Sequence, residues 1–173
     1  MKKALFVAPF ALSLAACGII PLPSIPIPNA EIPLSSVLAT TSNQVVYLNR
    51  NALGGASMPS QLRDLTITGD AVYVKKGGTL KSLRLYVRSS LPTTDCKLIG
   101  TMAYACPAAG EGSQVIGTVN LNATEPQKFT LRGEALDEAA KKGTGFFGVQ
   151  IIDGIPVESE IIELRNMRAQ PRL

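Results

Sequence analysis

Apolar and polar residues alternate in short runs along most of this chain, and glycine, proline or asparagine separates one run from the next. The clearest run is residues 83–88 (LRLYVR), where three aliphatic side chains alternate with two arginines and a tyrosine. A period of two is typical of a half-buried β-strand. Similar runs cover residues 44–48, 65–68, 71–74, 115–121, 128–131, 145–152 and 157–164. About seven or eight short strands at this spacing predict a mostly β fold, an antiparallel β-sandwich.

Turn residues separate several of these runs. Residues 75–78 (KKGG) form a hairpin-type break, and Asp153-Gly154 between two β-rich runs is a strong hairpin signal. Gly69-Asp70 interrupts another run, as a bulge or turn does. The chain is therefore expected to reverse direction at these points.

One segment predicts a helix instead. Residues 134–142 are rich in helix formers, with acids at the start and lysines at the end, which suits the helix dipole. Glu138 and Lys142 are spaced for an ion pair, and Gly143 suits the position after the last turn. We expect this short helix to cross from one sheet to the other. Over roughly residues 60–165 the pattern loosely resembles immunoglobulin-like sandwiches that carry a helix in one connection.

Composition limits the chemistry. The chain has 173 residues, enough for about one domain, and 46% of them are hydrophobic, enough for one real core. There is no histidine. Ser-His-Asp and Cys-His catalysis and every metal site that needs imidazole are therefore excluded.

The N-terminus has the pattern of an export signal. Two lysines follow Met1, a short apolar run covers residues 4–13, and Leu14-Ala15-Ala16-Cys17-Gly18 comes next. The apolar run is too short to span a bilayer as a helix. The first 18 residues resemble the signal of bacterial lipoproteins, whose lipobox is a leucine, two small residues and a cysteine.

This resemblance implies that residues 1–16 are removed and that Cys17 carries the lipid and begins the mature chain. Two acyl chains hold a protein stably on a bilayer. The resemblance also implies a place in the cell envelope, outside the cytoplasm, with the outer membrane favoured if the source has two membranes, because no aspartate follows the cysteine. The mature chain loses two lysines and keeps no basic cluster, so nucleic acid is not an expected partner.

Residues 17–33 predict a tether, because prolines are frequent in this segment and favour an extended polyproline conformation. The same segment contains six isoleucines and leucines after Cys17. It therefore packs on its own domain, on a partner protein or at the lipid surface. We expect the sandwich domain to span residues 34–166 and residues 167–173 to be a fraying basic tail.

Cys96 and Cys106 remain as a pair once Cys17 is lipidated, and export makes a disulfide between them the expected state. The apolar loop between them (residues 97–105) either completes the core or forms a binding surface. No cofactor or metal site is expected apart from the lipid on Cys17.

The candidate binding surface combines a basic stripe with this loop. Lys81, Arg84 and Arg88 with Tyr86 between the arginines would meet an anionic glycan or an acidic partner, unless this is simply a solvated face. The loop contributes Met102 and Tyr104.

Paired carboxylates can hydrolyse glycosides, but we interpret Glu158 and Glu160 as acids on a solvated strand face. The sequence thus predicts a lipid-anchored, non-enzymatic sandwich that acts as a structural or interaction subunit of a cell-envelope or surface-layer assembly. Its expected partners are the bilayer and another envelope protein. The alternative is a lipoprotein that binds a small apolar ligand or a glycan.

Overall fold

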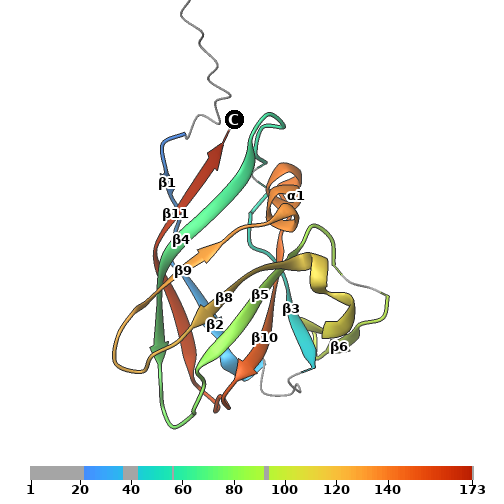
Figure 1. Ribbon diagram of the computed structural model, residues 1–173. Helices are drawn as coiled ribbons and strands as arrows, with labels where there is room; N and C mark the ends of the chain where they lie inside the picture. Colours follow the sequence, from blue (N-terminus) through green and yellow to red (C-terminus); the bar gives the residue numbers. More distant parts are fainter. Residues whose placement is uncertain (1–21, 37–42, 56, 92–93, 173) are drawn as a thin grey trace, which may run out of the picture.

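Two antiparallel sheets form the protein in the computed structural model, which describes residues 22–36, 43–55, 57–91 and 94–172 (Figure 1). The first sheet has the order β1-β11-β4-β9, and β2 also pairs with β11. Its strands are β1 (Ile25–Pro26), β2 (Ala30–Pro33), β4 (Arg63–Val74), β9 (Gln127–Leu131) and β11 (Ile161–Arg172).

The second sheet has the order β6-β7-β3-β10-β5-β8. Its strands are β3 (Gln44–Asn51), β5 (Ser82–Arg88), β6 (Lys97–Ile99), β7 (Ala103–Pro107), β8 (Val115–Asn120) and β10 (Phe146–Asp153). Three short 3-10 turns are Leu34–Ser36, Ala108–Gly110 and Gly112–Gln114. The expected mostly β sandwich is confirmed, with more strands among the described residues than the seven or eight expected.

The main core lies between the sheets. Leu83 from the second sheet, Ile162 from the first and Leu136 from the helix are fully buried in one cluster.

Gly69 lies within β4, so the interruption expected there is not a break in this strand. A Cβ at Gly69 would lie 2.8 Å from Cζ of Phe129, so the glycine makes room for this ring. The irregularity lies opposite, on β11, where the register shifts between Arg165 and Arg168.

Helix α1 (Glu134–Lys142) connects β9 in the first sheet to β10 in the second, as expected. Gly143 follows it with φ of 66°, a left-handed conformation that glycine adopts without strain. Glu138 and Lys142 form the expected ion pair at 2.6 Å. Asp137 accepts a hydrogen bond from Leu65 N at 2.7 Å and so ties the helix to β4. No helix among the described residues is long and apolar enough to cross a membrane.

The two expected hairpins are wrong. β4 and β5 belong to different sheets, and so do β10 and β11, so both connections pass from one sheet to the other. Turn residues such as Asp153-Gly154 allow the chain to reverse, but they do not decide which strand the next segment pairs with. Here seven residues separate β10 from β11, enough for the chain to reach the opposite sheet.

Both ends of the domain extend beyond the expected boundaries. β1 and β2 pair with β11, so residues 25–33 lie on their own domain rather than forming a free tether. Ile32 is buried and Ile27 packs against the core, in line with the first of the three alternatives for this segment. The expected basic tail is instead the end of β11. The physical reason is that an edge strand has unpaired N–H and C=O groups, and these two segments satisfy each other.

Candidate functional site

Three connections between the sheets lie at one end of the sandwich, opposite the end where the described chain begins (Figure 1). They follow β4, β8 and β10. We call residues 75–81 together with residues 152–160 the crossover tip. One carboxylate joins the two segments of this tip.

Glu160 is fully buried and its side chain accepts five hydrogen bonds. Its Oε1 accepts from three successive backbone N–H groups of the β4–β5 connection, at 2.8, 3.0 and 2.7 Å from residues 76, 77 and 78. Its Oε2 accepts from the Tyr73 hydroxyl at 2.7 Å and from Val157 N at 2.8 Å. The carboxylate therefore holds both connections in one fixed arrangement.

The electrostatics follow from these contacts. Burial raises the pKa of Glu160, but the hydrogen bonds from backbone N–H groups and from Tyr73 outweigh burial and lower this pKa to about 2. The pKa of the Tyr73 hydroxyl is raised by burial and by the neighbouring carboxylate. Glu160 is thus an ionised acceptor and Tyr73 a neutral donor at ordinary pH.

Glycine is required where the two connections touch. A Cβ at Gly78 would collide with Oε2 of Glu160 and lie 2.7 Å from the carbonyl oxygen of Ile155. Gly154 has φ of 93° and lies against the backbone of residues 79–80. The glycines that predicted turns therefore also allow the close approach of the two segments.

The crossover tip exposes apolar side chains. The exposed fraction of Ile155 is 70%, and Ile152 and Val157 are also exposed. Lys75 and Lys76 lie on the neighbouring connection and are exposed as well. A rigid backbone that presents aliphatic side chains next to cations is suited to contact with another molecule.

An open cleft adjoins the tip, with a volume of about 490 Å³. Its lining includes the aliphatic side chains of Leu80 and Leu121 and the basic side chains of Lys75 and Lys81. The remaining lining residues are Tyr73, Thr79, Asn122, Ala123 and Gln127. The lining of the cleft therefore combines apolar side chains with cations and amide groups.

A second polar cluster lies on the outer face of the second sheet. The Tyr47 hydroxyl donates to Glu111 Oε2 at 2.6 Å, and Arg88 Nε donates to the same oxygen at 3.0 Å. The Arg88 guanidinium also lies over the Tyr47 ring, 5.4 Å from its centre. Burial and Glu111 raise the pKa of Tyr47, and the hydrogen bond to Glu111 raises that of Arg88. This cluster pins the turn around Glu111 onto the sheet.

The expected binding surface is not one surface in the structure. Tyr86 is only 2% exposed, and its hydroxyl donates to Gln150 at 2.5 Å. Lys81 belongs to the crossover tip and pairs with Asp153 at 3.6 Å. Ala108 and Val115, on the segment that leads into β8, pack against the cluster that contains Tyr86, which explains why this tyrosine is buried.

The other residues of that surface are also dispersed. Arg84 and Arg88 are half-buried, and Arg88 is bound to Glu111 as described above. Tyr104 is half-buried against the cluster that contains Tyr47, whereas Met102 is 75% exposed at the turn between β6 and β7. The apolar loop thus completes the core in part and exposes the rest.

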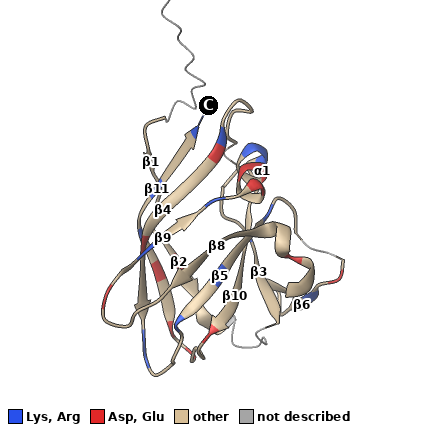
Figure 2. Ribbon diagram, in the orientation of Figure 1, with Lys and Arg blue, Asp and Glu red and all other residues tan. Residues whose placement is uncertain are grey.

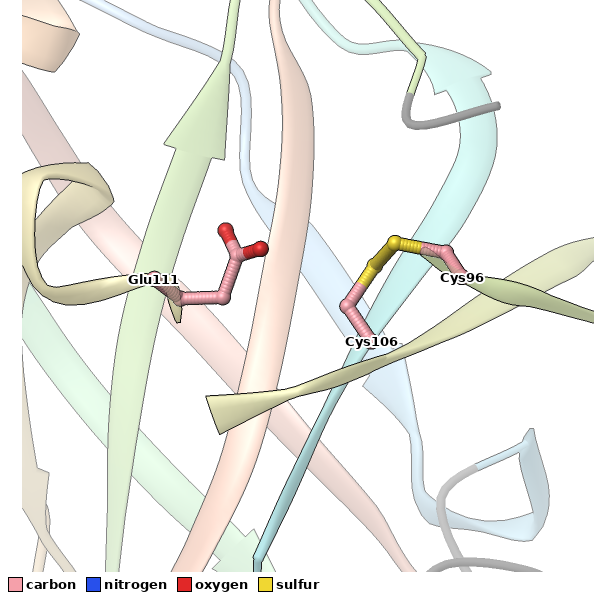
Figure 3. Close-up of side chains that lie close together, drawn as sticks. All are labelled: Cys96, Cys106 and Glu111. Atoms are coloured by element: carbon pink, nitrogen blue, oxygen red, sulfur yellow. A yellow bond between two sulfur atoms is a disulfide. The ribbon is translucent and has the colours of Figure 1, made fainter. Parts of the chain in front are cut away.

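Cys96 and Cys106 form a disulfide, with 4.3 Å between their Cα atoms, and tie β6 to β7 (Figure 3). A carboxylate oxygen of Glu111 and the two sulfur atoms lie within 4.8 Å of one another. Disulfide sulfur atoms are not thiolates, and Arg88 and Tyr47 already bind the carboxylate. The group is therefore not suited to hold a metal ion in this oxidised form.

Sequence reasoning missed the two acids that organise these clusters. Glu160 was interpreted as solvated together with Glu158, but only Glu158 is exposed. A usable signal was the KKGG segment, which offers several N–H groups without strand partners to a carboxylate. Glu111 had no such signal, because its partners are 64 and 23 residues away in the chain. Cys17 lies outside the described residues.

A scan against models of known protein families finds no match, and a search of curated protein sequences finds no related protein.

Proposed function

We propose that this chain is a lipid-anchored protein of the cell envelope, outside the cytoplasm, that acts without enzymatic activity as an interaction subunit of an envelope or surface-layer assembly. The anchor is Cys17, as the lipobox implies, and the outer membrane is the favoured site if the source has two membranes. The observation that carries the proposal is the crossover tip, with Ile155 70% exposed on a backbone that Glu160 holds rigid.

The arrangement of the two ends supports this function. The described chain begins near the end of β11, and the crossover tip lies at the opposite end of the sandwich (Figure 1). A protein anchored through its N-terminus therefore presents the tip away from its anchor. The partner that fits is another envelope protein with an apolar patch for Ile155 and Val157 and acids that face Lys75 and Lys76.

The test is the mass of the native assembly. The lipidated protein is extracted from its own membranes in mild detergent, and the intact complex is weighed by mass spectrometry. We expect a larger assembly for the wild type and its loss in the double variant Ile155→Ser, Val157→Ser. The matched control is Leu98→Ser, Met102→Ser, which removes exposed apolar side chains elsewhere and should keep the assembly. Recovery of the wild type as a lone acylated chain would overturn the proposal.

The second candidate function is binding of a small ligand, a glycan or an apolar molecule. The cleft of about 490 Å³ beside the tip favours it, because sites of this kind combine an apolar floor with a few polar groups. In the same experiment this function predicts a single chain with extra mass. Lys75→Gln would reduce this extra mass, whereas Lys97→Gln, remote from the cleft lining, would not.

A further inference from the structure

The end of the first sheet where the described chain begins carries three arginines on one face. Arg168, Gln170 and Arg172 alternate along β11, so their side chains share a face of the sheet, and all three are exposed. Arg63 on β4 is directly opposite Arg172 in the register and is exposed as well. We call Arg63, Arg168 and Arg172 the arginine face.

Positive charge on this face is incompletely balanced. Arg63 and Arg172 form no ion pair among the described residues, and like charges directly opposite each other on neighbouring strands are destabilising. Asp64 follows Arg63 in the chain, and Asp137 accepts hydrogen bonds from the N–H groups of residues 64 and 65 at 2.9 and 2.7 Å, which leaves three cations to two acids. Figure 2 shows the basic positions at the end of β11 and the start of β4. Such a face is suited to bind an anionic surface.

The path of the chain indicates which surface this is. Gln170 Nε2 donates to the carbonyl oxygen of Leu22 at 3.2 Å, and Arg168 Nη1 donates to the Ser24 hydroxyl at 3.2 Å. The first described residues therefore lie against the arginine face. Five residue steps connect Leu22 to Cys17, so the lipid-bearing residue is within roughly 18 Å of Leu22.

We propose that the arginine face binds the anionic phospholipid headgroups of the bilayer that holds the anchor. The proposal rests on the lipid anchor of the proposed function and adds an orientation to it. The headgroup phosphates neutralise the positive charge of the opposed arginines, and the crossover tip points away from the membrane. Guanidinium groups suit this role because they bind phosphate in a bidentate manner.

The experiment uses the mature chain from residue 17 with Cys17→Ser, which retains every described residue but has no lipid. Binding is measured by sedimentation with vesicles of phosphatidylcholine alone and with 30% phosphatidylglycerol. We expect binding to the anionic vesicles only, weakened at high salt. Each basic residue near such a surface strengthens binding about fivefold, so Arg63→Gln, Arg168→Gln, Arg172→Gln should weaken it on the order of 100-fold.

The matched control removes three exposed basic residues elsewhere with the same change in charge: Arg50→Gln, Lys97→Gln, Lys128→Gln. It should bind as the wild type does. An equal loss in both triple variants, or equal binding to both kinds of vesicle, would overturn the proposal. Because the probe carries no lipid, this result is independent of whether Cys17 is acylated in cells, which mass spectrometry of the native protein decides separately.

A stability measurement separates this role from a structural one. Removing one of two opposed arginines relieves repulsion, so Arg172→Gln should unfold at the same or a slightly higher temperature than the wild type while binding anionic vesicles less well. A variant that lost both stability and binding would contradict the assignment.

Discussion

Replacing Glu160 with glutamine tests whether one carboxylate holds the crossover tip together. Glutamine keeps the shape of the side chain but has a single acceptor oxygen and an NH₂ group that cannot accept. If its NH₂ group replaces Oε2, Val157 N loses its acceptor, and if it replaces Oε1, three N–H groups do. The variant therefore leaves at least one buried or partly buried N–H group without an acceptor in either orientation.

The magnitude follows from the hydrogen bonds. A buried or partly buried N–H group without an acceptor costs about 1–2 kcal/mol. The three other backbone bonds lose their charge assistance, at about 0.5–1 kcal/mol each. We therefore expect Glu160→Gln to lower the free energy of unfolding by about 4 kcal/mol at pH 7. Glu158→Gln is the matched control, because that side chain is exposed, and should change the free energy by less than about 0.5 kcal/mol.

The pH dependence gives the sharper test. The pKa of Glu160 is about 2 in the folded protein against an ordinary value of 4.5, so its stabilising contribution is full above pH 4.5 and is lost as the pH falls towards 2. Urea unfolding at pH 7, 4 and 2.5 should show a gap between wild type and Glu160→Gln that narrows as the pH falls. A gap below about 1 kcal/mol at pH 7, or an equal gap at pH 7 and 2.5, would refute the reasoning.

Three further predictions concern stability and are checked by urea unfolding. Removing the disulfide with Cys96→Ala, Cys106→Ala should lower the free energy of unfolding by about 3 kcal/mol, because the unfolded chain regains the freedom of a loop of about ten residues. A wild type whose free energy of unfolding is unchanged by a reducing agent would contradict this. Gly78→Ala should lower it by about 2 kcal/mol because the new Cβ collides with the carboxylate, whereas Gly77→Ala, with open space around it, should be nearly neutral. Glu111→Gln should lower it by about 2 kcal/mol, since the arginine that it binds loses its counter-charge; no change would show that this ion pair is unimportant.

The sandwich and its crossover helix were predictable because they depend on local patterns. Alternation marks β5 and acid-to-base polarity marks α1, and both signals lie within one segment. The C-terminal bound of β11 could not be predicted from the local sequence pattern. Residues 161–164 show the apolar pattern, but the strand continues to Arg172 because β4 and the N-terminal strands offer partners far away in the chain.

Buried polar residues were the main failure. Tyr86 occupies the solvent side of an alternating strand in the pattern, yet it is buried because a segment about 20 residues further on covers that face. Glu160 is adjacent to exposed residues and resembles them in sequence, yet three backbone N–H groups more than 80 residues earlier surround it. Burial of this kind depends on tertiary contacts, which alternation along one strand does not report.

The pairing of the N-terminal strands with β11 also has a mechanical consequence. β1 and β2 run antiparallel to β11 and form the first described part of the chain. A pull on the N-terminus is directed along these strands, so it loads their hydrogen bonds together in shear instead of opening them one by one. Tension applied to the N-terminal end would thus be resisted by the hydrogen bonds of this sheet before the core between the sheets is disturbed.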